Sequence, residues 1–211
     1  MSGTTFFMVG VDTEADDQWT LQGRKRLSVE NARALPRLQT LCDAYGVRPS
    51  YLVTHEMATR EPSRSILRDL SATGRCEIGA HLHPWSSPPY REEDLVGRYP
   101  SQLDDSQLET QLSELTAAIE TSVGVRPVSY RAGRHGFDSR SLRILEELRY
   151  RVDTSVDPLF NETRKGGPTF AGAPVFPYWP GHPDVRSPGA SSVLEIPVSS
   201  ATTPALPKAL E

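Results

Sequence analysis

Two histidines separated by one residue, His81 and His83, are the strongest chemical signal in the sequence. They follow the apolar residues 78–80, which are typical of a buried strand, and Pro84 ends the strand because it cannot donate to a ladder. Residues i and i+2 of a strand share a face, about 6.5–7 Å apart, so both imidazoles can approach one cation. An isolated His-x-His pair is often only structural, so a metal site needs support from other residues.

Two acidic residues repeat this spacing after another apolar run. Asp12 and Glu14 come directly after residues 6–11, which we expect to form a strand buried on both faces. One carboxylate oxygen with two histidine nitrogens is a common catalytic ligand set, and it leaves positions open for water and substrate. The second carboxylate could then accept a proton from that water. A solvated loop after a strand is the alternative interpretation of these acids.

An arginine beside the basic carboxylate would keep it ionised and oriented. Arg131 is the candidate, and it follows the expected strand 127–130 together with Arg134. Ordinary surface charge is the alternative. A site with oxygen and nitrogen ligands favours zinc as the first expectation and also admits cobalt, nickel, iron or manganese.

The order of strands and helices indicates how these residues meet. Apolar strands alternate with helical patterns, which predicts a parallel sheet with right-handed crossovers. Polar side chains follow successive strands, which favours a barrel over an open sheet. The expected strands, about seven, are 6–11, 50–53, 76–80, 127–130, 151–156, a short one near 175, and 193–198; the expected helices are 29–45, 60–73, 106–123 and 138–148.

Composition narrows the class of protein. The 211 residues are 37% hydrophobic and 24% charged, as in soluble globular proteins, and we expect one domain over 1–211 with an irregular Pro/Gly-rich insertion at about 157–192. A net charge of −4 gives no reason to expect a nucleic-acid partner. No stretch is apolar and long enough for a membrane span.

The first residues show no basic and apolar export signal, so we expect a cytoplasmic protein. Cys42 and Cys76 have no framework spacing and are interpreted as buried thiols, with a single disulfide as the alternative. The sequence leaves the oligomeric state open.

With these residues in this order, the chain resembles the polysaccharide deacetylases of the NodB homology group, carbohydrate esterase family 4, and in particular their WalW-like branch. The resemblance covers about residues 6–198. It implies a distorted (β/α) barrel and metal-dependent removal of an acetyl group from an amino sugar or a glycan or lipopolysaccharide precursor. It is carried by VDTEADD (11–17), EIGAHLHPW (77–85), YRAGR (130–134), VDTSVDP (152–158) and LEIPVS (194–199).

The resemblance also implies roles for individual residues. Asp12 would be the catalytic base, with Arg131 as its partner. The ligands of one divalent metal ion, zinc as the first expectation, would be Glu14, His81 and His83. A carbohydrate substrate would be contacted by Trp85, Arg134, His135 and Asp153, and Tyr178 and Trp179 could also stack on sugar rings.

The sequence departs from the family pattern in three places. Thr13 separates acids that are usually adjacent, and one residue rather than three separates the histidines, which places Trp85 where the second ligand is expected. Glu195 stands where the family has a histidine that acts as general acid. His135 and His182 are the possible replacements.

Two other functions remain open from the sequence. The chain could be a catalytically degenerate, carbohydrate-binding domain, since the last motif lacks its histidine. It could also be a metal-dependent hydrolase of cyclic or other small amides. In that group, however, the His-x-His pair usually lies on the first strand, and here it follows the third.

Overall fold

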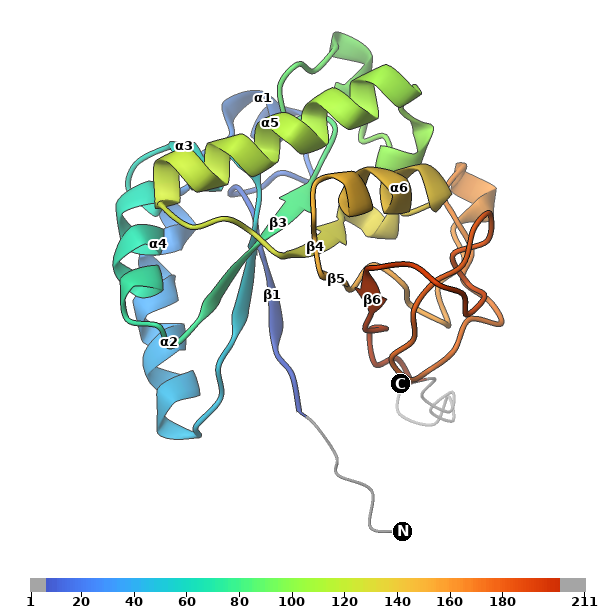
Figure 1. Cartoon of the computed structure of the whole chain (residues 1–211). Helices are drawn as coiled ribbons and strands as arrows, with labels where there is room; N and C mark the ends of the chain where they lie inside the picture. Colours follow the sequence, from blue (N-terminus) through green and yellow to red (C-terminus); the bar gives the residue numbers. More distant parts are fainter. Residues whose placement is uncertain (1–6, 202–211) are drawn as a thin grey trace, which may run out of the picture.

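A parallel β-sheet with helices packed around it forms the framework of the computed structural model, which describes residues 7–201 (Figure 1). Each strand pairs in parallel with the next one along the chain. The carboxyl ends of the strands therefore meet at one edge of the sheet. In sheet order the strands are β1 (Gly10–Thr13), β2 (Ser50–Val53), β3 (Glu77–Leu82), β4 (Ser129–Ala132), β5 (Val152–Asp153) and β6 (Leu194–Glu195).

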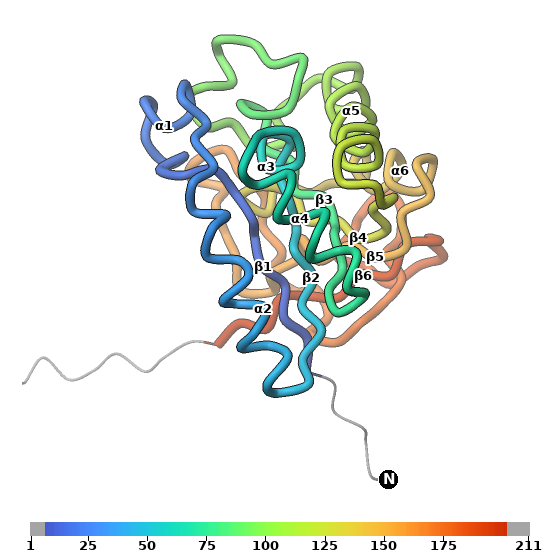
Figure 2. Tube along the Cα trace, turned by 90° about the vertical axis from the view of Figure 1, so that its left-hand side faces the viewer, coloured from blue at the N-terminus to red at the C-terminus, as the bar shows by residue number. Residues whose placement is uncertain are grey.

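The connections between the strands are mainly helical. Helix α5 lies across the sheet beside α3 and α6, and α2 and α4 run alongside each other in the side view (Figures 1 and 2). The α-helices are α1 (Leu21–Arg26), α2 (Leu35–Ala44), α3 (His55–Thr59), α4 (Ser63–Ala72), α5 (Asp105–Val123) and α6 (Ser139–Glu147). Short 3-10 turns are η1 (Glu30–Ala34), η2 (Glu92–Val96), η3 (Pro100–Gln102), η4 (Gly133–His135) and η5 (Thr163–Lys165).

The apolar face of α5 supplies much of the core that holds the sheet in place. Leu108, Leu112 and Ile119 recur at helical spacing and are fully buried. They belong to one cluster with Leu82 of β3 and Tyr130 of β4, the two strands that lead into the site. Burying each large apolar side chain contributes about 1.5–3 kcal/mol to the stability of the fold. This packing holds the ends of β3 and β4 in place.

The expected fold class is confirmed, with six strands in the described residues rather than about seven. Near Val175 the structure has only an isolated antiparallel bridge between Tyr178 and Glu195. Val175 is exposed and stands between Pro174 and Pro177, which cannot donate to a ladder. Over residues 7–201 the sheet is not closed by pairing of β6 with β1.

The first strand begins later than the sequence suggested. Phe6 lies outside the described residues, and Phe7 and Met8 are exposed and precede β1. The expectation of a buried strand at 6–11 was therefore wrong in its position. The shift places Asp12 inside β1 and Glu14 just beyond it.

Residues near the first turn explain where helices α2 and α6 begin. The helix expected at 29–45 begins at Leu35, after a 3-10 turn, and Pro36 occupies its first turn, where a missing N–H costs nothing. Asp138 caps α6, the helix expected at 138–148, and accepts bonds from the backbone N–H groups of Arg140 and Ser141. Helices α1 and α3 were not predicted; both are short, five or six residues.

Cys42 and Cys76 are buried free thiols, in line with the sequence. None of the helices within residues 7–201 combines the length and the apolarity that crossing a membrane requires.

Candidate metal centre

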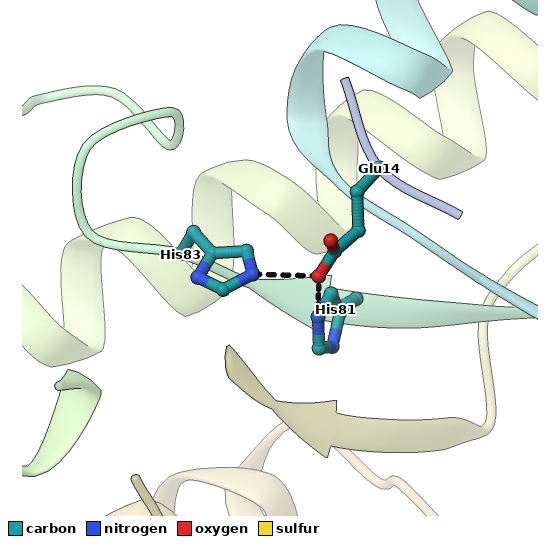
Figure 3. Close-up of side chains that lie close together, drawn as sticks. All are labelled: Glu14, His81 and His83. Carbon is teal, nitrogen blue, oxygen red and sulfur yellow. Dashed lines mark hydrogen bonds and ion pairs between the residues drawn. The ribbon is translucent and has the colours of Figure 1, made fainter. Parts of the chain in front are cut away.

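Three side chains from two distant parts of the chain meet at the carboxyl edge of the sheet (Figure 3). Glu14 follows β1, His81 lies near the end of β3, and His83 comes one residue after that strand. One carboxylate oxygen, Glu14 Oε1, lies 2.7 Å from His81 Nε2 and 2.8 Å from His83 Nε2. Both histidines are almost completely buried.

The tautomer of His81 shows why this group fits a cation. His81 Nδ1 lies 2.9 Å from the carbonyl oxygen of Arg131, and there it must be the donor. A neutral His81 then presents the lone pair of Nε2, not a proton, to the carboxylate oxygen of Glu14. A positive charge has to lie between these two acceptors, and either a proton on Nε2 or a metal ion can supply it. An imidazole anchored through its other nitrogen to a carbonyl is the usual arrangement of a metal ligand.

Burial and the close contacts among the three side chains shift their pKa values in different directions. Burial alone would raise the pKa of Glu14, but hydrogen bonds and attraction from the two imidazoles hold it well below its usual value. Burial lowers the pKa of His83 to about 4, and the neighbouring His81 adds to this. Burial acts the same way on His81, yet Asp12 and Glu14 raise its pKa overall. An ionised carboxylate and a neutral His83 are the forms that bind metals.

Trp85 and Gly133 fix the ring of His83. Trp85 stacks on His83 with centroids 4.2 Å apart and an angle of 29° between the planes. A Cβ atom at Gly133 would lie 2.4 Å from His83 Nδ1 and equally close to the carbonyl oxygen of Leu82. Only glycine permits this approach, so the Gly of the 130–134 motif sets the position of the imidazole.

The catalytic pair expected from the sequence is also brought together. Arg131 Nη1 donates to Asp12 Oδ1 at 2.6 Å, and Arg131 Nε donates to the carbonyl of Thr154 at 3.0 Å. The side chain of Asp12 is 39% exposed, whereas that of Glu14 is 17% exposed. Asp12 is thus the carboxylate that solvent and a substrate can reach. The backbone of Arg131 holds His81 while its side chain holds Asp12, so one residue links the two groups.

Two residues that we expected to contact the substrate are buried, so these two predictions were wrong. Trp85 is completely buried between His83 and the guanidinium of Arg24, so it has no face for a sugar. Asp153 is completely buried as well, and it accepts a 2.7 Å bond from Ser155 Oγ. Each of these residues supports the site from behind instead of lining it.

Asp153 has a second buried carboxyl group beside it. Glu195 is its register partner on β6 and is also fully buried. Burial raises the pKa values of both, and the proximity of Asp153 raises that of Glu195 further, whereas the contact with Glu195 lowers that of Asp153, because two carboxylates this close cannot both ionise at little cost. A hydrogen bond between them needs a proton on one member. Glu195 therefore stands behind the site and does not reach a substrate.

The remaining candidate residues, Arg134, His135 and His182, lie in different surroundings. Arg134 lines an open cavity and donates to Tyr99 Oη at 2.8 Å. His135 is half-buried, with Nδ1 2.9 Å from the carbonyl of Ser155. His182 lies on the outside, 3.2 Å from Glu146 of α6, so it is not a replacement for the general acid.

Sequence reasoning missed one aromatic residue at the site. Trp19 lies between β1 and α1 and is 59% exposed, with its ring 5.9 Å from that of His83 in an edge arrangement. Its place five residues after Glu14 was the only signal. Two other residues were expected to stack on sugar rings. Tyr178 is buried, so that expectation was wrong for it, whereas Trp179 is exposed.

Comparisons with known proteins bear on the fold. No family model matches the sequence, and no curated protein matches it. The structure is similar to that of a Mycobacterium smegmatis protein assigned as a polysaccharide deacetylase, with a TM-score of 0.62 and 20% identity over 91% of this chain and 58% of that one. It is also similar to the PuuE allantoinase, with a TM-score of 0.51 and 17% identity over 79% of this chain and 44% of that one.

At these identities the likeness shows the fold, and the chain spans less than two thirds of either protein. The chain therefore shares the polysaccharide-deacetylase fold expected from its motifs. Its assignment to the WalW-like branch stays a prediction.

Replacing Gly133 by alanine should weaken metal binding roughly 10–100-fold, as for other residues that orient a ligand, because the new methyl group displaces His83. Competition with a chelating dye would measure the affinity for zinc. Gly181→Ala is the control, since a Cβ there meets nothing closer than 3.2 Å. Equal affinities in Gly133→Ala and the unchanged protein would show that His83 is not held in this way.

Replacing Glu195 by glutamine should change how stability depends on pH. A carboxyl group whose pKa is raised on folding stabilises the fold below its unfolded pKa and loses that contribution as pH rises through the folded value. The unchanged protein should therefore lose stability on the alkaline side, by up to about 1.4 kcal/mol per pH unit, and Glu195→Gln should flatten this slope. Urea unfolding between pH 5 and 8 measures both, and identical slopes would contradict the shared proton.

Proposed function

We propose that this protein is a metal-dependent deacetylase that hydrolyses the N-acetyl group of an amino sugar, either free or within a glycan or lipopolysaccharide precursor. The observation that carries the proposal is the meeting of Glu14, His81 and His83 beside the ion pair of Asp12 and Arg131. A buried ligand group next to an exposed carboxylate is what metal-assisted amide hydrolysis requires.

The cation would be held by Glu14 Oε1 and the Nε2 atoms of His81 and His83, all within 4.8 Å of one another. When bound, a divalent cation supplies Lewis-acid chemistry, which polarises an amide carbonyl and acidifies water. Zinc is our first expectation for a carboxylate and two imidazoles, and cobalt, nickel, iron and manganese suit the same ligands.

Asp12 would act as the general base. Its carboxylate is exposed enough to receive the proton that the attacking water loses, and the 2.6 Å bond from Arg131 fixes its direction. Thr154 holds the guanidinium in turn through its carbonyl and its hydroxyl oxygen. The base therefore does not need to reorganise when it accepts the proton.

The departing nitrogen must receive a proton to leave as an amine. His135 is our candidate for this general acid, because it follows β4 in the same turn as Arg134 and is half-buried. Glu195, which stands in the family's place for this histidine, is enclosed in the fold with Asp153. A sugar ring could lie on Trp19, whose exposed indole reaches the edge of His83.

A second candidate is hydrolysis of a cyclic amide. An allantoinase has the same fold, and allantoin also presents an amide carbonyl to a nucleophile. The exposed Trp19 beside the centre favours a sugar over a small ureide.

The proposal predicts acetate release from N-acetylglucosamine oligosaccharides by the zinc-loaded protein. His81→Ala should lose both zinc and activity. Asp12→Asn should keep zinc but lose at least about 100-fold in rate, because only the base is removed. Glu147→Gln, an exposed change on α6, is the control expected to behave as the unchanged protein. Enzymatic acetate assay and metal analysis of the same samples give both readouts.

Other outcomes would contradict the proposal. Turnover of allantoin without acetate release from sugars would favour the second candidate. Tight glycan binding with no hydrolysis, unchanged by a chelator, would indicate a carbohydrate-binding domain.

A further inference from the structure

We propose that Arg24 and Arg134 form a subsite beside the metal centre that binds a phosphoryl group carried by the substrate. The subsite specifies the sugar of the proposed deacetylation as a sugar phosphate, and in this respect the inference rests on the proposed function.

The subsite has the room for such a group. An open cavity of about 550 Å³ lies between the segment after η2 and the turn η4. Gly97, Tyr99, Arg134 and Lys165 are among the residues that line it. Cavities of this volume are typical of small-ligand sites.

Arg134 enters this cavity from a constrained backbone. Its φ is +54°, the left-handed region that favours glycine, so the structure holds an arginine where a side chain is disfavoured. Its guanidinium lies over the ring of Tyr99 at 3.9 Å and donates to Tyr99 Oη and to the carbonyl of Gly97. All three contacts are with uncharged groups.

Arg24 reaches the same place from α1. Its guanidinium touches Gly97, where a Cβ atom would come within 2.8 Å of it. It donates to the carbonyls of Gln18 and Leu95, again uncharged groups. Burial and the neighbouring charge of Arg134 lower the pKa of Arg24, as expected of two guanidinium groups close together.

The acids nearby are already engaged by other cations. Arg98 pairs with Glu93 and with the buried Asp94, each at 3.2 Å. Lys165 pairs with Glu162 at 2.8 Å, and this carboxylate also accepts from Tyr99 Oη.

Within residues 7–201, Arg24 and Arg134 therefore have no carboxylate at ion-pair distance. Two like charges kept together without a counter-charge are costly unless an anion joins them.

The subsite is joined to the metal centre by direct contacts. The guanidinium of Arg24 lies 4.7 Å above the ring of Trp85, and Trp85 stacks on His83. Arg134 follows Gly133, the residue that packs against Nδ1 and Cε1 of the His83 ring. A substrate with its acetamido group at the centre would thus carry its anionic substituent towards these arginines.

A phosphoryl group matches these donors better than a carboxylate. It offers three oxygens and up to two negative charges, so it can accept from two guanidinium groups at once. The guanidinium groups keep their charge at any physiological pH.

Calorimetric titration tests the subsite apart from catalysis. The probes are inorganic phosphate, N-acetylglucosamine 1-phosphate and 6-phosphate, neutral N-acetylglucosamine, and N-acetylmuramic acid as the carboxylate-bearing sugar. We expect at least one sugar phosphate to bind 10-fold or more tightly than the neutral sugar. Titrations are repeated in His81→Ala, where phosphate bound by a metal ion cannot contribute.

Arg24→Gln and Arg134→Gln should each abolish most of this preference. Arg24→Lys and Arg134→Lys keep a charge and should retain part of it, which guards against a loss caused by misfolding. Arg143→Gln removes an exposed arginine of α6 and is the matched control. Thermal unfolding of each variant reports its folded state.

The outcomes separate the two proposals. Phosphate-dependent binding that needs both arginines, in a protein that releases no acetate, would support the subsite and contradict the deacetylase. Equal binding of neutral and phosphorylated sugars, or a preference that survives both glutamine variants, would overturn the subsite and leave the deacetylase standing. Tighter binding of N-acetylmuramic acid than of either sugar phosphate would overturn the phosphoryl assignment.

Discussion

A single carboxylate oxygen shared by two imidazole nitrogens is the constraint around which this site is built. Glu14 Oε1 lies within 2.8 Å of both Nε2 atoms, in a place where the histidines are shut off from water. His81 has already used its other nitrogen on the carbonyl of Arg131. Buried acceptors that face one another are unfavourable without a positive charge between them, and a proton on His81 or a metal ion can supply that charge.

The parallel sheet makes this meeting possible. In register, His81 of β3 lies beside Arg131 of β4, so the carbonyl that orients the ring and the guanidinium that orients Asp12 belong to one residue. Behind them, Ser155 donates to Asp153 and accepts from the N–H of Ala132. The site therefore depends on strand register more than on loop conformation, and a slip of one residue would turn the ligands away from one another.

Spacing in the sequence was enough to find the residues that strands present. The i, i+2 rule placed His81 and His83 on one face, and the acids after the first apolar run marked Asp12 and Glu14, of which the family resemblance assigned Glu14 as the ligand. Spacing could not show burial. Trp85 and Asp153 looked like substrate contacts because they stand next to the motifs, but packing by other segments encloses them.

Residues that reach the site only through tertiary contacts could not be predicted from the sequence. Trp19 and Arg24 lie between the strand expected at 6–11 and the helix expected at 29–45, where the sequence predicted neither, and only the folded chain places them against His83 and Trp85. The short helices α1 and α3 were not predicted for a similar reason. A five- or six-residue helix is stabilised by its contacts and not by its own periodicity.

The most direct test of the account is a crystal structure of the zinc-soaked protein with anomalous data collected on both sides of the zinc absorption edge. The account predicts one strong peak about 2.0–2.2 Å from Glu14 Oε1 and from the Nε2 atoms of His81 and His83. A peak at other residues, or Glu14 and the two histidines in direct contact in a crystal saturated with zinc, would contradict it.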